Sequence, residues 1–330
     1  MGPPVGLRTI DWVAGAIVTI DQCALPRDYE QLRITTVDEL IDAVSRLAIR
    51  GAPALGAAGA LGVALSAYRY PDDPAKVRAE SARLAAARPT AANLAWGVQR
   101  ALARLLDGAD AVLAEAQAVL AEDEQANQEA SRHAADLVLR LCERRPLRIL
   151  THCNTGRLAT VAWGTALGTV RHLAAAGQVE SVLADETRPL LQGTRLTAYE
   201  LAEAGIPYRI CPDSAAATAM ALGLVDCVLV GADRIAANGD VANKIGTFPL
   251  ALAAARHGIP FIVVAPRSTL DRTLPDGSGI AIEHRDSAEV THIGGQPVAP
   301  DGATAFNPAF DVTPADLVTA IVTETGVYRP

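Results

Sequence analysis

From residue 148 onward, short apolar runs alternate with windows of helical periodicity, and this alternation restricts the possible folds more than any other feature. The runs are residues 149–150, 179–184, 208–211, 227–230 and 260–264. Strands that are separated by helices indicate βαβ crossovers, which place the strands parallel in one sheet. We therefore predict an α/β protein whose C-terminal domain, residues 144–330, contains a doubly wound, mostly parallel sheet.

The first 143 residues have a different pattern and are predicted to form a smaller, mostly helical N-terminal domain. Residues 8–12 and 16–20 alternate like two strands of a hairpin, so this domain carries a short antiparallel sheet. Asp38 is expected to cap a helix over residues 39–49. Further helices are predicted over residues 52–69, 74–87, 91–106 and 109–143, the last being a long connecting helix.

Length and charge exclude several classes of protein. The chain has 330 residues, is 50% hydrophobic and has a formal net charge of -8, which is typical of a soluble globular protein with a substantial core. No basic run offsets the acidity, so we expect no binding to nucleic acid. The five cysteines contain no C-x-x-C pair, which argues against a disulfide framework or zinc ribbon and favours a reducing cytoplasm.

One uncharged segment has to be considered as a transmembrane helix. Residues 51–68 carry no charge over 18 positions, which is the length at which a membrane span becomes possible. Most of these residues are Ala and Gly, so a tightly packed, buried helix is the better interpretation. Residues 1–6 contain no apolar segment of a signal peptide. We therefore expect no association with a membrane.

Polar or reactive groups follow four consecutive strands of the predicted sheet. The segments are THCNTG at 151–156, DETRP at 185–189 with Gln192-Gly193, DS at 213–214, and GADR at 231–234. Such residues often only cap the next helix. However, ligands of doubly wound sheets bind outside the carboxyl ends of the strands. Four such endings in succession, with Cys153 and Asp233 among them, therefore predict a site at this edge.

Cys153 is the candidate reactive thiol. It lies between a strand end and an expected helix start, where helix N–H groups favour the thiolate. His152 is its neighbour, but adjacent residues of an extended chain face opposite ways, so a catalytic Cys-His pair is not expected. Cys23, Cys142 and Cys227 are interpreted as small buried hydrophobic residues.

Two segments combine a cation with a glycine-containing helix start and are candidate anion sites. The segment NKIGT at 243–247 contains one of only two lysines in the chain. The segment RGAP at 50–53 has a proline suited to the first turn of a helix and a glycine that lets an anion approach the backbone. Arg88 is placed to add a second guanidinium. Together these groups predict a phosphate held between the two halves of the chain.

Several motifs of common cofactor and metal sites are missing. The chain has no G-x-G-x-x-G after a strand, no G-x-x-x-x-G-K-[ST] and no H-E-x-x-H. Nicotinamide, P-loop nucleotide and zinc-protease sites are therefore not indicated.

The ordered strings together resemble methylthioribose-1-phosphate isomerase of the methionine salvage pathway. They are RGAPALG at 50–56, RPTAANL at 88–94, THCNTG at 151–156, DETRP at 185–189, GADRIAANG at 231–239 and NKIGT at 243–247. The resemblance spans nearly the whole chain. It implies a Rossmann-like C-terminal domain, a homodimer, a small-molecule sugar phosphate as substrate, and neither a metal ion nor an organic cofactor.

The resemblance also assigns site residues motif by motif. Cys153 and Asp233 would be the catalytic pair, and the substrate-binding residues would be Arg50, Gly51, Ala52, Arg88, Gln192, Asn243 and Lys244. Opening the ring of a sugar 1-phosphate needs an acid at the ring oxygen, after which hydrogen moves from C2 to C1. We assign Asp233 as this acid, kept protonated by desolvation. Cys153 would transfer a proton or stabilise the transition state.

Two alternatives stay open. Isomerases of 5-deoxyribose 1-phosphate and ribose 1,5-bisphosphate resemble this chain in fold and in the Cys/Asp pair, and the sequence does not place the subsite for the 5-substituent. From another class, the related regulatory subunits of the exchange factor for translation initiation bind and assemble without catalysis. The presence of both Cys153 and Asp233 favours the enzyme.

Overall fold

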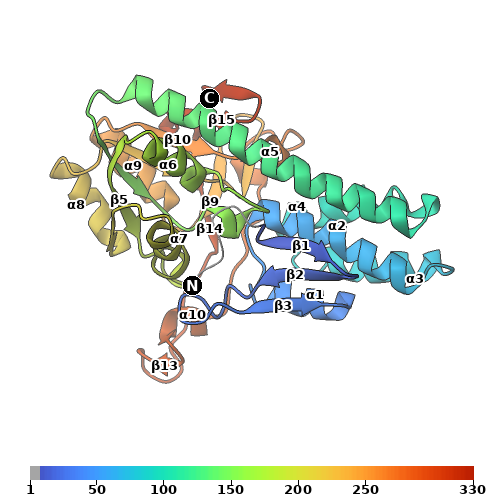
Figure 1. Ribbon diagram of the computed structural model, residues 1–330. Coiled ribbons are helices and arrows are strands. Elements are labelled where there is room, and N and C mark those ends of the chain that lie inside the picture. The colour runs from blue at the N-terminus through green and yellow to red at the C-terminus, as the bar shows by residue number, and fades with distance from the viewer. Residues whose placement is uncertain (1–7) are drawn as a thin grey trace.

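A helix of 33 residues, α5 (Ala109–Leu141), runs along the molecule and packs against both of its halves (Figure 1). The computed structural model describes residues 8–330, so the expectation for residues 1–6 lies outside the described residues. Val112 near the start of α5 joins the core of the helical half, and Val138 near its end joins the core against the large sheet. The division into domains after residue 143 stays a prediction.

The N-terminal half contains the predicted hairpin, extended by a third strand. The strands are β1 (Ile10–Val13), β2 (Ala16–Ile20) and β3 (Gln31–Ile34), all antiparallel and in that spatial order. The helices are α1 (Val37–Ser45), α2 (Ala52–Arg69), α3 (Pro74–Ala85) and α4 (Ala92–Leu102). The sequence does not predict strand β3, because the strand has only four residues and two of them are polar and exposed.

The expected cap of the first helix is wrong by two positions. Thr36, not Asp38, caps α1, because the Glu39 amide donates to Thr36 Oγ1 at 3.2 Å. The Glu39 carboxylate in turn accepts from the Thr36 amide at 3.1 Å. These reciprocal bonds form a capping box, which the T-x-x-E spacing allows and which leaves Asp38 inside the first turn.

Helix α2 is buried at nearly every position, as predicted for the uncharged segment. Its backbone touches that of α4, where a Cβ atom on Gly97 would lie 1.9 Å from the Gly56 carbonyl oxygen. Among the helices of residues 8–330, none combines the length and the apolar character needed to span a bilayer.

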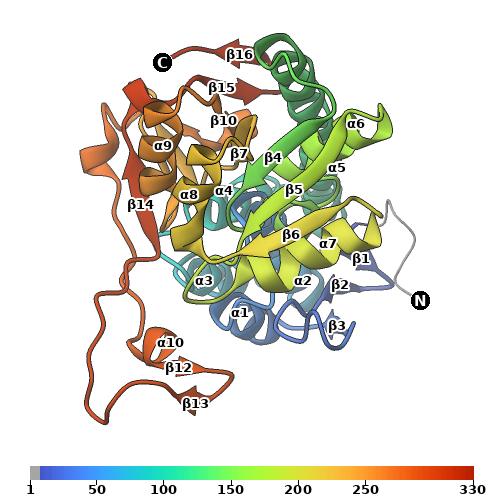
Figure 2. The same ribbon diagram turned by 90° about the vertical axis from the view of Figure 1, so that its left-hand side faces the viewer.

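The large sheet of the C-terminal half has seven strands in the order β16-β15-β10-β7-β4-β5-β6 (Figure 2). The strands are β4 (Leu147–Thr151), β5 (Val179–Asp185), β6 (Tyr208–Cys211), β7 (Cys227–Val230), β10 (Phe261–Val264), β15 (Ala320–Thr323) and β16 (Gly326–Tyr328). All neighbours are parallel except β15 and β16. The parallel strands have the Rossmann order 3-2-1-4-5-6, so the order reverses between β4 and β7. The predicted doubly wound sheet is confirmed.

Helices cover both faces of this sheet. On one face, α5, α6 (Ala166–Ala175) and α7 (Ala198–Glu203) share a core with Ile149. On the other face, α8 (Ala216–Ala221) and α9 (Thr247–Arg256) share a core with Leu150. Successive residues of β4 thus enter different cores, as the alternation of side chains along a strand requires.

A second, smaller sheet follows β7 and was not predicted. It consists of β8 (Arg234–Ala236), β9 (Val241–Lys244), β11 (Leu270–Asp271) and β14 (Phe310–Thr313), in the order β11-β8-β9-β14. Each strand has at most four residues and mixes polar with apolar side chains, which gives no clear period. Between β11 and β14 the chain extends into an arm with α10 (Ala288–Thr291), β12 (His292–Ile293) and β13 (Gln296–Pro297), which projects at the lower left of Figure 2.

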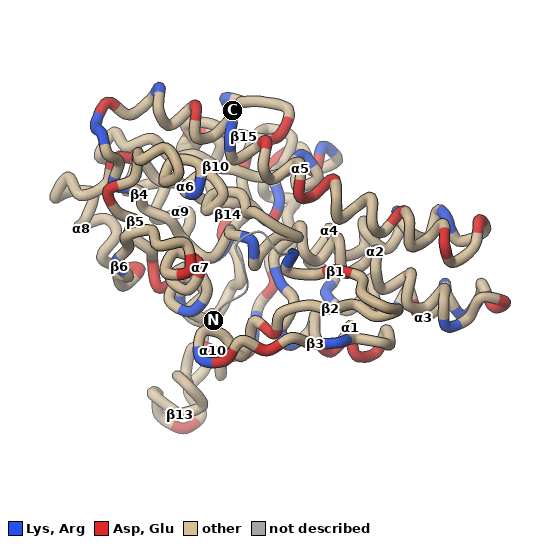
Figure 3. The backbone as a smooth tube through the Cα atoms, in the orientation of Figure 1, with Lys and Arg blue, Asp and Glu red and all other residues tan. Residues whose placement is uncertain are grey.

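Basic and acidic residues are interspersed along the backbone (Figure 3). Neither α5 nor the drawn strands carry a long run of one charge.

Candidate active site

The reversal of strand order brings Cys153 and Asp233 to one place. Cys153 follows β4 by two residues, and Asp233 follows β7 by three. Because β4 and β7 are adjacent and parallel, their carboxyl ends meet at the switch point, where doubly wound sheets bind ligands. Both residues line one cleft between the large sheet and the helical half.

All nine residues that the sequence analysis selected line this same cleft. They are Arg50, Gly51, Ala52, Arg88, Cys153, Gln192, Asp233, Asn243 and Lys244. They come from six segments that span nearly 200 positions of the chain, so only folding brings them together.

The backbone of Cys153 is held on both sides. Its amide donates to Thr187 Oγ1 at 2.9 Å, and its carbonyl accepts from Thr197 Oγ1 at 2.6 Å. These bonds secure a left-handed backbone conformation with φ of 61°, which is unusual for a residue with a side chain. Such a conformation at a cleft is typical of functional positions.

The expectation of a thiolate stabilised by a helix start is wrong for Cys153. No α-helix begins there: the chain passes through a short 3₁₀ turn at Arg157–Ala159, and α6 begins only at Ala166. Burial raises the pKa of the Cys153 thiol, although the positive charges of Arg50 and Lys244 act in the opposite direction. A neutral thiol flanked by two cations is therefore the resting form at neutral pH.

Asp233 has the electrostatic character expected of an acid. Burial raises the pKa of its carboxyl group, and the charges of Lys244, Arg88 and Arg50 oppose the increase. The Asp233 amide donates to the Ala242 carbonyl at 2.9 Å, which ties the residue to β9. The raised pKa agrees with the prediction that desolvation keeps this carboxyl protonated.

Lys244 ends β9 with its ammonium group in the cleft. Nζ donates to the Ala309 carbonyl at 2.9 Å and lies 4.9 Å from the centre of the Phe310 ring. Burial lowers the pKa of Lys244, whereas Cys153 and Asp233 raise it. The cation is thus oriented by the chain itself and keeps further donors for a ligand.

The helix start after Lys244 is not a free anion site, contrary to the sequence analysis. Asp311 already occupies it, because its carboxylate accepts from the Gly246 amide at 2.8 Å and the Phe248 amide at 3.1 Å. An internal carboxylate thus supplies the negative charge that a helix N-terminus favours. The nearby Asn243 side chain donates to Thr247 Oγ1 at 3.0 Å.

The other helix start, at Gly51, faces the cleft. Gly51 has a φ of +91°, and a Cβ atom there would lie 2.3 Å from the Ala159 carbonyl oxygen, so only glycine fits. Ala52 is the first residue of α2, and a proline follows it as predicted. Arg50 donates from Nε to Gln22 Oε1 and from Nη1 to the Asn154 carbonyl, both at 3.0 Å. Part of the Arg50 guanidinium therefore orients the loop that carries Cys153.

Arg88 meets a carboxylate that the sequence analysis missed. Its Nη2 donates to Glu283 Oε2 at 3.0 Å, and Thr90 Oγ1 donates to the same oxygen at 3.0 Å. The other Glu283 oxygen accepts from Arg285 Nη1 at 2.6 Å, and Arg285 also lines the cleft. Glu283 and Arg285 lie in a segment without regular secondary structure. The only sequence signal was the close spacing of their opposite charges.

Gln192 and Arg88 each keep a buried polar atom without a protein partner among the described residues. These atoms are Gln192 Oε1 and Arg88 Nε. A buried polar group without a partner is costly in a protein that has no use for it. Their position at the cleft agrees with a polar ligand.

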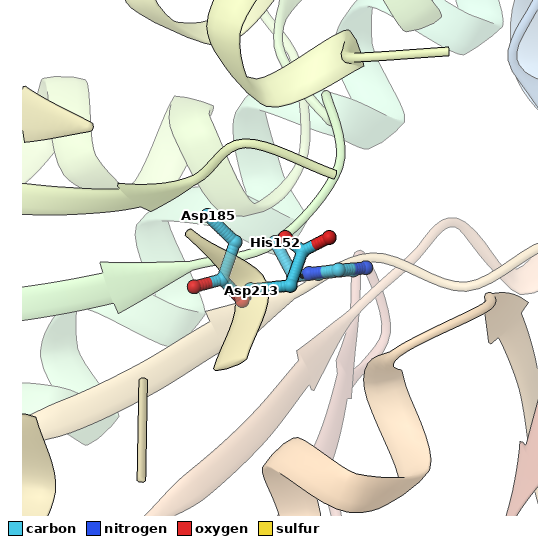
Figure 4. A group of neighbouring side chains, drawn as sticks. All are labelled: His152, Asp185 and Asp213. Carbon is cyan, nitrogen blue, oxygen red and sulfur yellow. Dashed lines mark hydrogen bonds and ion pairs between the residues drawn. The ribbon is translucent and has the colours of Figure 1, made fainter. Parts of the chain in front are cut away.

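His152, Asp185 and Asp213 form a polar cluster behind the cleft (Figure 4). Their ligand atoms lie within 4.8 Å of one another, a spacing that metal ions also use. Both carboxylate oxygens of Asp213 accept hydrogen bonds from the backbone, one from the Thr187 amide and one from the Arg188 amide, at 2.7 Å each. The hydrogen-bond partners of the His152 ring are Asp185 Oδ2 and the Ile245 carbonyl. The bonds of Asp213 tie the cluster to the loop that follows β5.

A Rossmann-like sheet with a thiol and a carboxyl group at its switch point, facing a helical half that adds arginines, defines an α/β protein whose cleft is lined by cationic and polar groups. Residues 48–330 match the model of the Initiation factor 2 subunit family. The chain belongs to this family.

Relatives within the family carry isomerase names. A protein of Nocardia farcinica described as a probable bifunctional methylthioribose-1-phosphate isomerase/methylthioribulose-1-phosphate dehydratase is 62% identical over 99% of this chain, which spans only 60% of that protein. A methylthioribose-1-phosphate isomerase of Pelotomaculum thermopropionicum is 48% identical, with coverage of 98% of this chain and 92% of the relative. A 5-deoxyribose 1-phosphate isomerase of Moorella thermoacetica is 49% identical, covering 98% and 95%.

Two solved structures have the same fold. One, of 5-methylthioribose 1-phosphate isomerase from Pyrococcus horikoshii, has a TM-score of 0.90 at 39% identity and covers 98% of this chain and 93% of its own. The other, titled as the delta subunit of translation initiation factor eIF-2B from A. fulgidus, has a TM-score of 0.87 at 42% identity, covering 98% and 96%.

Proposed function

We propose that this protein is an aldose-ketose isomerase that converts 5-methylthioribose 1-phosphate to 5-methylthioribulose 1-phosphate in methionine salvage. The observation that carries the proposal is the meeting of Cys153 and Asp233 at the switch point, in a cleft with several cations. The isomerase names of relatives that are 62% and 48% identical support the same reaction.

In the proposed reaction, Asp233 acts as the acid. It gives its proton to the ring oxygen, and the bond between this oxygen and C1 breaks. Hydrogen then moves from C2 to C1, the C2 hydroxyl loses its proton to the Asp233 carboxylate, and a ketone forms at C2. Cys153 lies beside the reacting carbons in this scheme and transfers a proton or stabilises the transition state. No atom is gained or lost, so the reaction needs no external oxidant or reductant.

The cations and amides of the cleft bind the substrate in this proposal. Arg50, Arg88 and Lys244 attract the phosphate, since charge-assisted hydrogen bonds to phosphate are strong. Gly51 and Ala52 bring the start of α2 close to it. Gln192 Oε1, which has no partner in the protein, accepts a hydrogen bond from one ribose hydroxyl. The side-chain amide of Asn243 donates a hydrogen bond to another.

The 5-substituent distinguishes the proposed substrate from its alternatives. The 49% identity to a 5-deoxyribose 1-phosphate isomerase favours that sugar as the second candidate. Ribose 1,5-bisphosphate would need a further cation for its second phosphate. Arg285, the remaining cation of the cleft, is paired with two carboxylates, Glu283 at 2.6 Å and Glu289 at 2.5 Å. Arg88 is paired with Glu283 alone and keeps Nε for a ligand. The bisphosphate is therefore disfavoured.

We propose in addition that the protein is a cytoplasmic homodimer. The support is the resemblance to the isomerases, together with the five cysteines, which are all free. Light scattering of the purified protein tests the dimer, and a single-chain mass would contradict it.

Phosphorus and carbon NMR test the reaction. Purified protein is incubated in parallel with 5-methylthioribose 1-phosphate, 5-deoxyribose 1-phosphate and ribose 1,5-bisphosphate, alongside Cys153→Ser and Asp233→Asn. Ketose formation from the methylthio sugar, lost in both folded variants, supports the proposal. If only one of the other two sugars is turned over, that sugar replaces the methylthio sugar as the proposed substrate. Binding of all three sugars without turnover favours a regulatory subunit.

A further inference from the structure

His152 links the two loops that carry Cys153 and Lys244. Its side chain is only 1% exposed. On one side, Nδ1 lies 2.9 Å from Asp185 Oδ2 at the end of β5, as Figure 4 illustrates. On the other side, Nε2 lies 2.8 Å from the Ile245 carbonyl oxygen, which belongs to the residue after Lys244.

The hydrogen-bond partners of the imidazole ring determine which of its two nitrogens carry a proton. A carbonyl oxygen only accepts, so Nε2 carries a proton and donates it to Ile245. The other nitrogen faces a carboxylate, so a second proton lies between Nδ1 and Asp185. Burial lowers the pKa of His152, but the hydrogen bond and the charge of Asp185 outweigh burial and raise it overall. The ring is therefore fixed in one orientation by two charge-assisted or polar bonds.

The turn after Lys244 is shaped around this ring. Gly246 has a φ of +105°, and a Cβ atom there would lie 2.7 Å from His152 Cε1. The glycine thus lets the backbone approach the imidazole ring closely. Cys153 directly follows His152, and Lys244 lies two residues before Gly246. The contact between His152 and Gly246 therefore joins the segments of Cys153 and Lys244, which are 91 positions apart in sequence.

We propose that His152 is a positioning residue for the isomerisation: its Nε2–H holds the Ile245 carbonyl and thereby sets Lys244 relative to Cys153, while Asp185 orients the ring. The inference rests on the proposed function only for its effect on turnover. The titratable groups that face the ring are Asp185 from β5, Asp213 after β6, Asp311 from β14 and, through Asp185, Cys211 at 3.4 Å.

Two variants separate orientation from charge. Asp185→Asn keeps the geometry, because a neutral ring still donates from Nε2 to Ile245 and accepts from the new amide at Nδ1. His152→Gln removes the link, because one amide does not span both partners. Cys211→Ser is the matched control, since it contacts the same carboxylate but not the ring.

The first readout is the pH dependence of Cys153 alkylation by iodoacetamide, followed by peptide mass spectrometry. Lys244 lowers the pKa of the Cys153 thiol, so its displacement in His152→Gln raises the pH at which Cys153 reacts by about half a pH unit. Asp185→Asn and Cys211→Ser leave that pH unchanged. An unchanged pH in His152→Gln overturns the inference, whether or not the protein turns over a sugar.

The turnover of the methylthio sugar supplies the second readout. In His152→Gln, kcat/KM for the methylthio sugar falls about 10-fold to 100-fold, the usual effect of a small displacement in an active site. Asp185→Asn stays within about threefold of the wild type. Absence of turnover in the wild type overturns the proposed function alone, since the alkylation result still decides the role of His152.

Should His152→Gln not fold, the imidazole N–H signals of the wild type and of Asp185→Asn decide. The wild type has two downfield N–H signals from His152, and Asp185→Asn has one. A wild-type His152 whose Nε2 carries no proton overturns the inference, because the bond to the Ile245 carbonyl is then absent.

Discussion

Replacing Glu283 by Gln tests how strongly one carboxylate ties the helical half to the large-sheet half. Glu283 accepts from Arg88 and Thr90 on one oxygen, both at 3.0 Å, and from Arg285 on the other at 2.6 Å. Its side chain is 19% exposed, so water screens these contacts only in part. The amide of a Gln side chain has the same size but loses the charge and turns an N–H toward the arginines.

The expected loss of stability follows from the pKa of Glu283. Burial raises this pKa, but Arg88 and Arg285 outweigh burial and hold it at about 2, against an ordinary value of 4.5. At 1.36 kcal/mol per pH unit, the difference corresponds to about 3 kcal/mol. Because the folded-state pKa is depressed, this stabilisation is complete above pH 4.5 and is lost as the pH falls toward 2.

Urea unfolding followed by circular dichroism measures the effect. At pH 7 we expect Glu283→Gln to lower the free energy of unfolding by about 2–3 kcal/mol. The difference from the wild type narrows as the pH is lowered from 5 to about 3.5, because the Glu283 carboxyl of the unfolded wild-type chain then takes up a proton while the folded carboxyl, with its pKa of about 2, stays ionised. Glu289→Gln is the matched control, since Glu289 pairs with Arg285 but not with Arg88. A variant as stable as the wild type at pH 7, or a difference independent of pH, would refute the reasoning.

Three further predictions concern the pH profile and the helices. Because burial raises the pKa of Asp233 and the proposed acid must be protonated, kcat/KM falls as the pH rises through that pKa, and a pH–rate profile without an alkaline decrease contradicts the assignment. Gly97→Ala places a Cβ atom 1.9 Å from the Gly56 carbonyl oxygen. It should therefore lower the stability by about 1–3 kcal/mol or more in thermal unfolding. Thr36→Ala removes the α1 cap and costs about 1 kcal/mol, whereas Thr36→Ser retains most of it, and equal losses in both would show that the cap bond is unimportant.

Strongly apolar strands were predictable from the sequence because a continuous run of apolar residues indicates a buried strand without reference to the rest of the chain. The strands at Tyr208–Cys211 and Cys227–Val230 have the predicted bounds, since each is a compact apolar run between helical windows. Strands β8, β9 and β14 were not predictable in this way. Strand β9 pairs with β8 nearby in the sequence and with β14 more than 60 positions later, and this pairing, not a hydrophobic period, defines the three strands.

The candidate site was predictable residue by residue but not as a set of contacts. Cys153 and Asp233 were selected because they follow strands, and the structure places them together. The helix start at Gly246 was misjudged because Asp311, 65 positions later, fills it. Glu283 escaped notice because its partner Arg88 is 195 positions away.

By itself, the sequence determined the class of fold and which segments end in reactive groups, because periodicity and strand ends are local properties of the chain. Only the tertiary structure decided which of these ends meet. The Rossmann strand order sets β4 beside β7 and so joins Cys153 to Asp233. The same folding buries both groups, and desolvation then raises their pKa values. Proximity and desolvation arise from long-range packing, which no local pattern in the chain records.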